Sequence, residues 1–408
     1  MKRVLYIHQY FQDPTCNSSS IRSYEVAFAL VQNGYDVSVI TSSHRNQFNR
    51  FKTLLCVPES NNFITVYTLP VSYSNKYSFT RRIFSFVLYS ILSTILALFL
   101  RAHLIYASST PLTVALPALV RRLLFRTPFV LEVRDVWPDI PISMGFIRNS
   151  FLLYLIQLFS HIAYTKASKI IALSPDMKAR LIRNYRVKPD SCLVATNFFS
   201  PKEFPKITSF SAPCPSIITN LKKGGKYIIL YSGTLGIVNN PNYIVDLALS
   251  IVDLPIRILV IGSGNMESEF KEYAISTNML NDKIFLLPPM HRSELIPYMY
   301  YSDFMISTVK DIPILSENSA NKFFESLASH SVTLINHGGW MEQLLTETLS
   351  GFSLTQDATV AHARLKSLLS NPSLISTMKS NARSLAVNNF TASKVTSSIV
   401  VFLSSLLS

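Results

Sequence analysis

The strongest constraint on the fold is an alternation of apolar, strand-like runs with helical segments, which occurs twice along the chain. The runs of the first series are Val4–His8, Val37–Thr41, Leu104–Tyr106, Phe129–Val133, Ile170–Leu173 and Leu193–Ala195. Those of the second series are Tyr227–Ser232, Ile256–Ile261, Lys283–Leu287, Asp303–Ser307 and Val332–Ile335. Several are continuous and β-branched, which is typical of parallel strands buried on both faces. Because helical segments such as Ser23–Asn33 fill the intervals, the sequence predicts two doubly wound α/β units.

The length and the composition place a boundary between the two series. A chain of 408 residues is too long for one compact core and fits two domains. Proline and glycine crowd between residues 201 and 226, which is a linker signal. We therefore predict an N-terminal domain over 1–200, a linker over 201–226 and a second domain over 227–385. Ligands of such units bind at the carboxyl ends of the strands, so two facing units would form a cleft.

The net charge of +14 indicates an anionic partner. Nucleic acid, an anionic membrane surface and a phosphorylated substrate all meet that description. The sequence has no zinc-finger spacing, RNP-like string or long basic helix, so nucleic acid ranks last and a membrane surface is favoured. The cysteines at 16, 56, 192 and 214 are widely separated and form no CxxC pair, which fits a reducing cytoplasm.

Residues 83–100 form an uncharged run between Arg82 and Arg101 that reaches the lower length limit for a membrane-spanning helix. The run lies between two strand-like segments of one α/β domain, and crossing a bilayer would divide that domain. We therefore expect a helix that covers the sheet or lies in the membrane interface. This places the protein on the inner face of the cytoplasmic membrane as a peripheral protein.

The segment from Pro313 to Ala328 carries two carboxylates eight positions apart, Glu317 and Glu325. Apolar residues at helical spacing predict a helix that starts near Ser319, with Glu317 in the loop before it and Glu325 between one and two turns inside. The free amides of the first turn, with Lys322 beside them, form an anion site suited to a diphosphate. Acceptor carboxylates on either side of an anion site suit a nucleotide sugar.

Further motifs follow strands. Tyr231–Gly236 and Val260–Gly264 are glycine turns that let backbone approach a phosphate, and Glu132–Pro138 holds charged groups at the end of a strand. No acid follows the second turn at the dinucleotide spacing, so a nicotinamide cofactor is not predicted.

Together these motifs, with Val4–Phe11 and Asn33–Thr41, resemble in their order the retaining glycosyltransferases of the GT-B type, family 4. The likeness is greatest to the subgroup that builds bacterial surface polysaccharides, including amino-sugar transferases of O-antigen synthesis. It implies two Rossmann-like domains facing across a cleft and a C-terminal helix over 386–408 that packs back on the N-terminal domain. It further implies a UDP-sugar donor carrying a hexosyl or N-acetylhexosaminyl group, and a lipid-linked (polyprenyl diphosphate) saccharide acceptor. The chain contains no Asp-x-Asp string, which fits a reaction that needs no metal and no other cofactor.

The resemblance also implies a role for individual residues. Glu325 would bind the ribose, Glu317 the donor sugar and Lys322 the leaving diphosphate. The catalytic candidates are Asp135, Glu317 and Lys322. The nucleotide-binding candidates are Gly233, Thr234, Gly236, Gly262, Asn321 and Glu325, and those of the acceptor side are His8, Arg22 and Arg134.

Two departures from the family pattern keep other functions open. Ile237–Asn242 contains no basic residue, so Lys322, Lys310 or Arg292 would have to neutralise the diphosphate. The loop Gln12–Ile21 is rich in serine where relatives often carry paired glycines. The alternatives are a non-catalytic or weakened partner in a membrane polysaccharide-assembly complex and a sugar-nucleotide epimerase.

Overall fold

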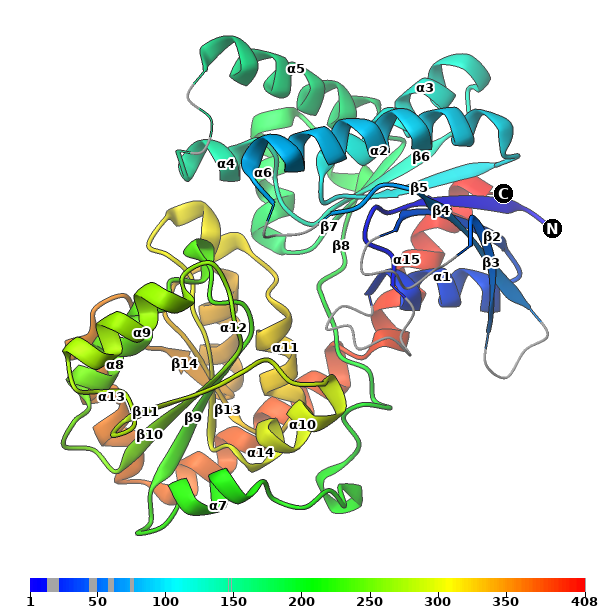
Figure 1. Cartoon of the computed structure of the whole chain (residues 1–408). Helices are drawn as coiled ribbons and strands as arrows, with labels where there is room; N and C mark the ends of the chain where they lie inside the picture. Colours follow the sequence, from blue (N-terminus) through cyan, green and yellow to red (C-terminus); the bar gives the residue numbers. More distant parts are fainter. Residues whose placement is uncertain are drawn as a thin grey trace. The chain divides into compact units, whose positions relative to one another are not determined.

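The computed structural model describes residues 1–12, 22–43, 50–57, 62–73, 77–145, 147 and 149–407. The chain divides into two compact units (Figure 1). Unit 1 comprises Met1–Thr196 and Ser393–Ser408, and unit 2 comprises Asn197–Ala392. Each is built on its own largely parallel sheet, so the prediction of two Rossmann-like α/β units is confirmed.

Unit 1 alternates strands with helices. Its strands are β1 (Arg3–Ile7), β2 (Asp36–Ser42), β3 (Lys52–Cys56), β4 (Phe63–Leu69), β5 (Leu104–Ser108), β6 (Phe129–Val133), β7 (Lys169–Ala172) and β8 (Cys192–Val194). Its helices are α1 (Arg22–Gln32), α2 (Phe79–Phe99), α3 (Ala115–Phe125), α4 (Asp139–Ser143), α5 (Ser150–Lys166), α6 (Pro175–Tyr185) and α15 (Ala392–Leu407). The described strands have the order β3-β4-β2-β1-β5-β6-β7-β8 and all pair in parallel except β3 with β4.

The sheet of unit 1 is buried on both faces. In β1, Leu5 and Ile7 belong to the core under α2, α3, α5 and α6, whereas Val4 and Tyr6 are buried on the opposite face. Figure 1 shows α2, α3 and α5 on one side of this sheet and α1 with α15 on the other. Burial on both faces is why the strands read as continuous apolar runs.

Strands β3 and β4, which form an antiparallel pair at the edge of the unit 1 sheet, were not predicted from the sequence. The side chains of β3 alternate between exposed and half-buried, so the strand lacks the apolar run that marks the others.

Helix α2 contains the uncharged run of residues 83–100. Ser78 caps its start by accepting from the Arg81 amide, and the Tyr89 hydroxyl donates to the Ile40 carbonyl, 2.8 Å away, in the sheet. Among the described helices, it is the one whose length and composition would allow it to cross a membrane.

Unit 2 has the same alternation. Its strands are β9 (Tyr227–Ser232), β10 (Ile256–Ile261), β11 (Ile284–Leu287), β12 (Phe304–Ser307), β13 (Val332–Ile335) and β14 (Gly351–Ser353). Its helices are α7 (Ser216–Leu221), α8 (Asn242–Ser250), α9 (Glu267–Ser276), α10 (Arg292–Tyr301), α11 (Asn321–Ala328), α12 (Trp340–Thr348), α13 (Ala358–Leu369) and α14 (Pro372–Asn389). The parallel order of the described strands is β11-β10-β9-β12-β13-β14.

Strand β9 lies at the centre of unit 2 and separates two cores. Ile229 and Tyr231 pack under α8, α9 and α13, while Ile228 and Leu230 pack under α7, α10, α11 and α12. The direction in which successive strands are added reverses between β9 and β12. Such a switch point is where doubly wound sheets bind ligands.

Two predicted boundaries are wrong. Residues 201–226 are not a free linker but part of unit 2, because Phe204, Ile218 and Leu221 are buried in its core. Phe210 stacks on Tyr300 with their ring centroids 3.9 Å apart. The predicted C-terminal helix over 386–408 is two helices: α14 belongs to unit 2, and α15 belongs to unit 1.

Candidate functional site

The switch point of unit 2 gathers the predicted donor-side residues. The glycine loop 233–236 follows β9, and the segment from Thr308 to Ala320 leads from β12 into α11. Because β9 and β12 are adjacent and parallel, both connections leave the same edge of the sheet.

Two glycine turns pack against one another at this edge. The Gly233 amide donates to the Ile261 carbonyl at 2.9 Å, and the Leu235 amide donates to the Ser263 carbonyl at 3.0 Å. A Cβ on Gly262 would lie 1.9 Å from the Gly233 oxygen, so only glycine permits this approach. Gly262 therefore holds the first turn in place, which explains the glycine without a direct nucleotide contact.

Lys322 lies beside the first glycine turn. A Cβ on Gly233 would be 3.1 Å from the Lys322 ammonium nitrogen, which also lies 5.1 Å from the centroid of the Tyr231 ring. Burial lowers the pKa of Lys322 to about 8, although the negative charge of Glu325 opposes this shift. Within the described part of the chain, the ammonium makes no hydrogen bond or ion pair. It is thus a cation in the second position of α11, open to an anion.

Helix α11 begins at Asn321, two residues later than predicted, and no side chain caps it. Asn318 instead stabilises the preceding turn, because its side-chain oxygen accepts a hydrogen bond from the Ala320 amide at 2.9 Å. The Phe323 amide donates to the Ala320 carbonyl at 3.1 Å, and no side chain caps the other amides of the first turn, which leaves those available to a ligand.

Glu325 lies inside α11 and is 7% exposed. One of its oxygens, Oε1, accepts from the Arg292 guanidinium at 2.8 Å. Arg292 also makes two hydrogen bonds of 2.8 and 3.0 Å to Glu203. Burial alone would lower the pKa of Arg292, but the two carboxylates outweigh it and raise that pKa. No described residue donates to the second Glu325 oxygen, Oε2, which leaves it for the hydroxyls of a ligand.

Glu317 and the glycine-loop residues complete this group. Glu317 is the last residue of a short 3-10 turn, Pro313–Glu317, and is half-buried just before α11. Thr234 is exposed at the tip of the loop, where its carbonyl accepts from the Tyr231 hydroxyl at 2.8 Å. Gly236 ends the loop. These positions match the predicted order of loop, turn and helix.

Of the three cations considered for the diphosphate, the geometry favours Lys322. Arg292 is 12% exposed and already bonded to two carboxylates. Lys310 is exposed, and its backbone amide donates to the Val238 carbonyl at 2.9 Å. Lys322 alone of the three lies against the glycine turn.

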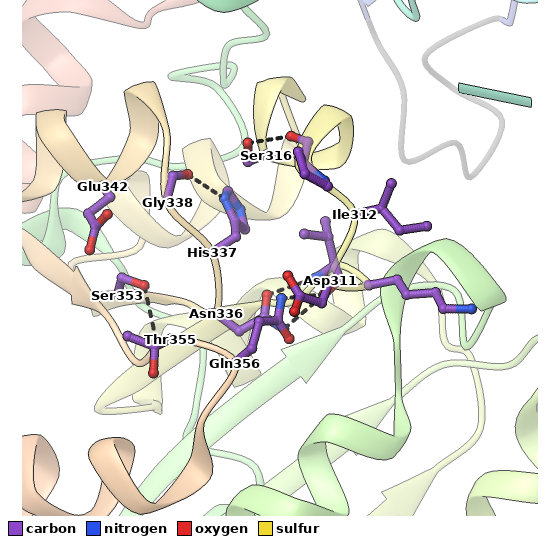
Figure 2. Close-up of a pocket in the computed structure, with 13 residues that line it drawn as sticks. Asp311, Ile312, Ser316, Asn336, His337, Gly338, Glu342, Ser353, Thr355 and Gln356 are labelled. Carbon is purple, nitrogen blue, oxygen red and sulfur yellow. Dashed lines mark hydrogen bonds between the residues drawn. The ribbon is translucent and has the colours of Figure 1, made fainter. Parts of the chain in front are cut away.

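A cavity of about 230 Å³ opens next to the segment that carries Glu317 (Figure 2). Its walls come from residues 309–316 and from the polar turns after β13 and β14. The Asn336 side chain links these walls: its oxygen accepts a hydrogen bond from the Val309 amide at 2.9 Å, and its nitrogen donates to the Gln356 side-chain oxygen at 3.1 Å. His337 lines the cavity, and its Nε2 is buried without a partner among the described residues. These residues were not predicted from the sequence, although a polar Asn-His-Gly-Gly turn after a buried strand was a signal for them.

In unit 1 the structure overturns the role expected of Arg22. Its guanidinium is 3% exposed and bonds Glu132 at 2.8 and 3.0 Å, as well as the Thr196 and Ala195 carbonyls at 2.6 and 2.9 Å. Burial would raise the pKa of Glu132, but Arg22 holds it below its ordinary value. With its donors engaged inside the core, Arg22 stabilises the unit and is not placed to bind a phosphate.

The remaining acceptor-side candidates, His8 and Arg134, and the catalytic candidate Asp135 lie at the ends of two strands separated by β5. His8 follows β1, and Arg134 and Asp135 follow β6. Arg134 Nη1 lies 3.4 Å from His8 Nε2. Because a guanidinium only donates, Nε2 must accept, and the proton of His8 sits on Nδ1. Burial, with help from Arg134, lowers the pKa of His8 to about 3, so this imidazole is neutral at physiological pH.

Asp135 accepts from the Thr110 hydroxyl at 2.9 Å and is half-buried. Glu132, the first charged residue of the Glu132–Pro138 motif, pairs with Arg22. The serine-rich part of the Gln12–Ile21 loop lies outside the described residues. In the described ranges, no group of three or more His, Cys, Asp or Glu side chains is arranged to hold a metal ion.

Comparisons with known families agree with both units. Residues 19–197 match the model of the glycosyl transferase 4-like domain, and residues 217–385 match that of glycosyl transferases group 1. The chain is a glycosyltransferase of the GT-B type.

Solved structures share the fold of this GT-B chain over its whole length. Sucrose-phosphate synthase from Thermosynechococcus elongatus is 14% identical with a TM-score of 0.76, over 100% of this chain and 99% of that one. HepE from Anabaena, solved in complex with UDP and glucose, is 14% identical with a TM-score of 0.69, over 99% and 100%. WaaG, a glycosyltransferase involved in lipopolysaccharide biosynthesis, is 12% identical with a TM-score of 0.69, over 98% and 99%. None of the curated proteins compared with the sequence matches it.

Proposed function

We propose that this GT-B glycosyltransferase moves a hexosyl or N-acetylhexosaminyl group from a UDP-sugar to a lipid-linked saccharide, with retention of configuration. The observation that carries the proposal is the placement of Lys322 against Gly233, on a helix start flanked by Glu317 and Glu325. A cation and open amides suit the diphosphate, and carboxylates on either side suit hydroxyl groups. The related HepE was solved with UDP and glucose, which supports UDP as the nucleotide.

Each donor-side group has a distinct task in the proposed reaction. Oε2 of Glu325 accepts from the ribose hydroxyls, while Arg292 fixes the position of the carboxylate through Oε1. Glu317 accepts from hydroxyls of the sugar. Lys322 and the amides of the first turn of α11 stabilise the negative charge that grows on the diphosphate as it leaves.

The proposed chemical step is a front-face displacement at the anomeric carbon. The acceptor oxygen forms a bond to that carbon as the bond to the phosphate oxygen breaks, and the hydroxyl proton passes to the departing phosphate. Placement and charge stabilisation then supply the catalysis, without a covalent intermediate or a divalent cation.

On the acceptor side, we propose that His8, Arg134 and Asp135 face the acceptor. These residues follow strands β1 and β6, which lie on either side of β5, next to the switch point of unit 1. A neutral His8 offers a hydrogen bond without adding charge, and Asp135 offers an acceptor oxygen. The proposed setting is surface polysaccharide assembly, such as that of O antigen or capsule, at the inner face of the cytoplasmic membrane. WaaG, which shares the fold, is involved in lipopolysaccharide biosynthesis.

The test is turnover of a panel of UDP-sugars in the presence of a chelator, with and without a polyprenyl diphosphate-linked saccharide. We expect UDP release that rises with the lipid-linked acceptor and falls at least tenfold in Glu317→Gln. Glu347→Gln, which changes an exposed carboxylate on α12, serves as the matched control and should leave turnover unchanged.

Two results would replace the proposal. Conversion of the UDP-sugar to an epimer without UDP release would identify an epimerase. No turnover of any donor, despite UDP binding, would identify a non-catalytic partner.

A further inference from the structure

Helix α2 presents an apolar stripe away from the sheet. Residues four apart share one face of a helix, and Ile83, Val87, Ile91, Ile95 and Phe99 are all exposed. Phe99 is 81% exposed. The opposite side of α2 packs on the sheet through buried residues such as Tyr89 and Ala97. One face is therefore held by the domain, and nothing in the described part of the chain covers the other.

Helices α3 and α5 extend this apolar surface. Residues 123–125 at the end of α3 are exposed, with Leu123 at 82%. Helix α5 carries a stripe of its own, Phe151, Leu155, Leu158 and Ile162, of which Phe151 is 71% exposed. Helix α3 contacts both α2 and α5, and Figure 1 shows all three on the same side of the unit 1 sheet. We call the outward surface of these three helices the apolar layer.

The charges carried by α2, α3 and α5 and by the residues next to their ends have one sign. Residues 79–126 and 149–166 contain no Asp or Glu. Exposed cations lie at the helix ends: Arg81 at the start of α2, Arg101 after its end, Arg126 after α3 and Lys166 at the end of α5. Cations at the ends of apolar helices can reach lipid phosphates while the stripes contact acyl chains. Two copies of this surface would instead bring like charges together.

We propose that the apolar layer is a docking surface for an anionic lipid bilayer, with α2, α3 and α5 lying in the interface parallel to the membrane plane. This deepens the proposed function and rests on its membrane setting, although docking itself requires neither a donor nor turnover. The negatively charged surface of a bilayer complements the cations at the helix ends. The acyl region accommodates the exposed aliphatic and aromatic side chains.

The packing of α2 explains why it lies in the interface and does not span. Its length of 21 residues corresponds to about 31 Å, enough to cross a bilayer. The Tyr89 hydroxyl, however, bonds the Ile40 carbonyl of the sheet, and Arg121 of α3 donates to the carbonyls of Ala97 and Leu100. A spanning α2 would have to leave these partners or carry the edge of an open sheet into hydrocarbon.

The test is co-flotation of the full chain with vesicles of phosphatidylcholine alone or with 30% phosphatidylglycerol. We expect binding to the anionic vesicles that weakens with salt. A triple variant, Phe99→Ser, Leu123→Ser and Phe151→Ser, should weaken binding at least tenfold. Replacing Arg81, Arg101 and Arg126 by Gln should weaken binding to anionic vesicles about fivefold for each charge removed.

Matched controls separate docking from misfolding. Val401→Ser on α15 and Ile275→Ser on α9 remove side chains that are 71% and 59% exposed outside the apolar layer, so vesicle binding should not change. An unchanged unfolding transition of unit 1, followed through Trp137 in a Trp340→Phe background, shows that the triple variant is folded. Unchanged UDP binding, which reports on unit 2, keeps this proposal distinct from the proposed function. Absence of wild-type binding to anionic vesicles overturns the inference. So does a stable homodimer that the triple variant dissociates, or vesicle-bound protein that resists extraction with alkaline carbonate.

Discussion

The protonation state of Lys322 governs the affinity of the proposed donor site for a diphosphate. Its ammonium lies beside Gly233 with a pKa of about 8, close enough to neutrality for pH to decide the charge. A lysine in water would remain charged to far higher pH. Burial therefore makes the donor site sensitive to mildly alkaline conditions.

We expect the affinity for UDP to fall as the pH rises from 7.5 to 9.5. Above pH 8 the free protein loses the Lys322 proton, and binding of an anion must then restore it. The diphosphate of UDP is ionised throughout this range, because the second ionisation of a phosphate lies near pH 6. The measurement is calorimetric titration across pH, with Lys322→Arg as control, since a guanidinium stays charged. A wild-type affinity that is flat over this range would contradict the role of Lys322.

The buried pair of Arg22 and Glu132 yields a prediction about stability. Arg22→Met leaves a carboxylate uncompensated at 0% exposure and should reduce the free energy of unfolding of unit 1 by about 3–5 kcal/mol. The double variant Arg22→Met, Glu132→Leu should recover most of this loss. Trp137 and Trp340 are the two tryptophans, so denaturation of a Trp340→Phe background follows unit 1 through Trp137.

The control for this pair is Arg3→Met, which breaks an exposed ion pair with Asp36 in the same unit. The expected change is about 0.5 kcal/mol or less. An Arg22→Met variant as stable as this control would mean that Arg22 is not structural.

At the scale of elements, the strands that the sequence revealed are those buried on both faces. The run Tyr227–Ser232, for example, was predicted with its observed bounds, because both faces of β9 are apolar. Strand β3 was missed because its exposed edge breaks that pattern. The segment 201–226 was misjudged because its prolines and glycines mask the spacing of Phe204, Ile218 and Leu221, whose burial depends on tertiary packing.

The same contrast holds in the candidate site. The relative positions of Glu317, Lys322 and Glu325 could be predicted from the sequence. Once the start of helix α11 is placed, the number of residues between them determines where each lies on the helix or in the turn before it. The ion partners could not, because Arg22 meets Glu132 across 110 positions and Arg292 meets Glu203 across 89. Sequence shows that a charge is present but not which distant group will neutralise it.

The two interlocked glycine turns give a prediction at this scale. Gly262→Ala places a methyl group 1.9 Å from the Gly233 oxygen and should destabilise unit 2 by at least about 2 kcal/mol while weakening UDP binding. Gly338→Ala, whose nearest neighbour is a Glu342 side-chain oxygen at 3.3 Å, is the matched control for stability. Thermal unfolding and UDP titration provide the readouts. A Gly262→Ala variant as stable as the wild type would contradict this prediction, because the two glycine turns could then move apart without loss of folding free energy.

For the whole molecule, the division into two units predicts where a nucleotide acts. UDP should slow amide hydrogen exchange most in unit 2, around the 233–236 loop and the start of α11, and far less in β6 and α5 of unit 1. Mass spectrometry of peptides with and without UDP measures this. Protection centred on His8 and Asp135 would instead place the nucleotide on unit 1.

The most direct test of the donor site is calorimetric titration of UDP, with a chelator present, into the wild type, Glu325→Gln and Glu203→Gln. Both carboxylates bond Arg292, but only Glu325 belongs to α11, so Glu203→Gln controls for changes in their shared partner. We predict that the wild type binds UDP, that Glu325→Gln binds at least tenfold more weakly, and that Glu203→Gln binds nearly as the wild type does. Failure of the wild type to bind UDP, or equal binding by Glu325→Gln, would contradict the assignment of this site.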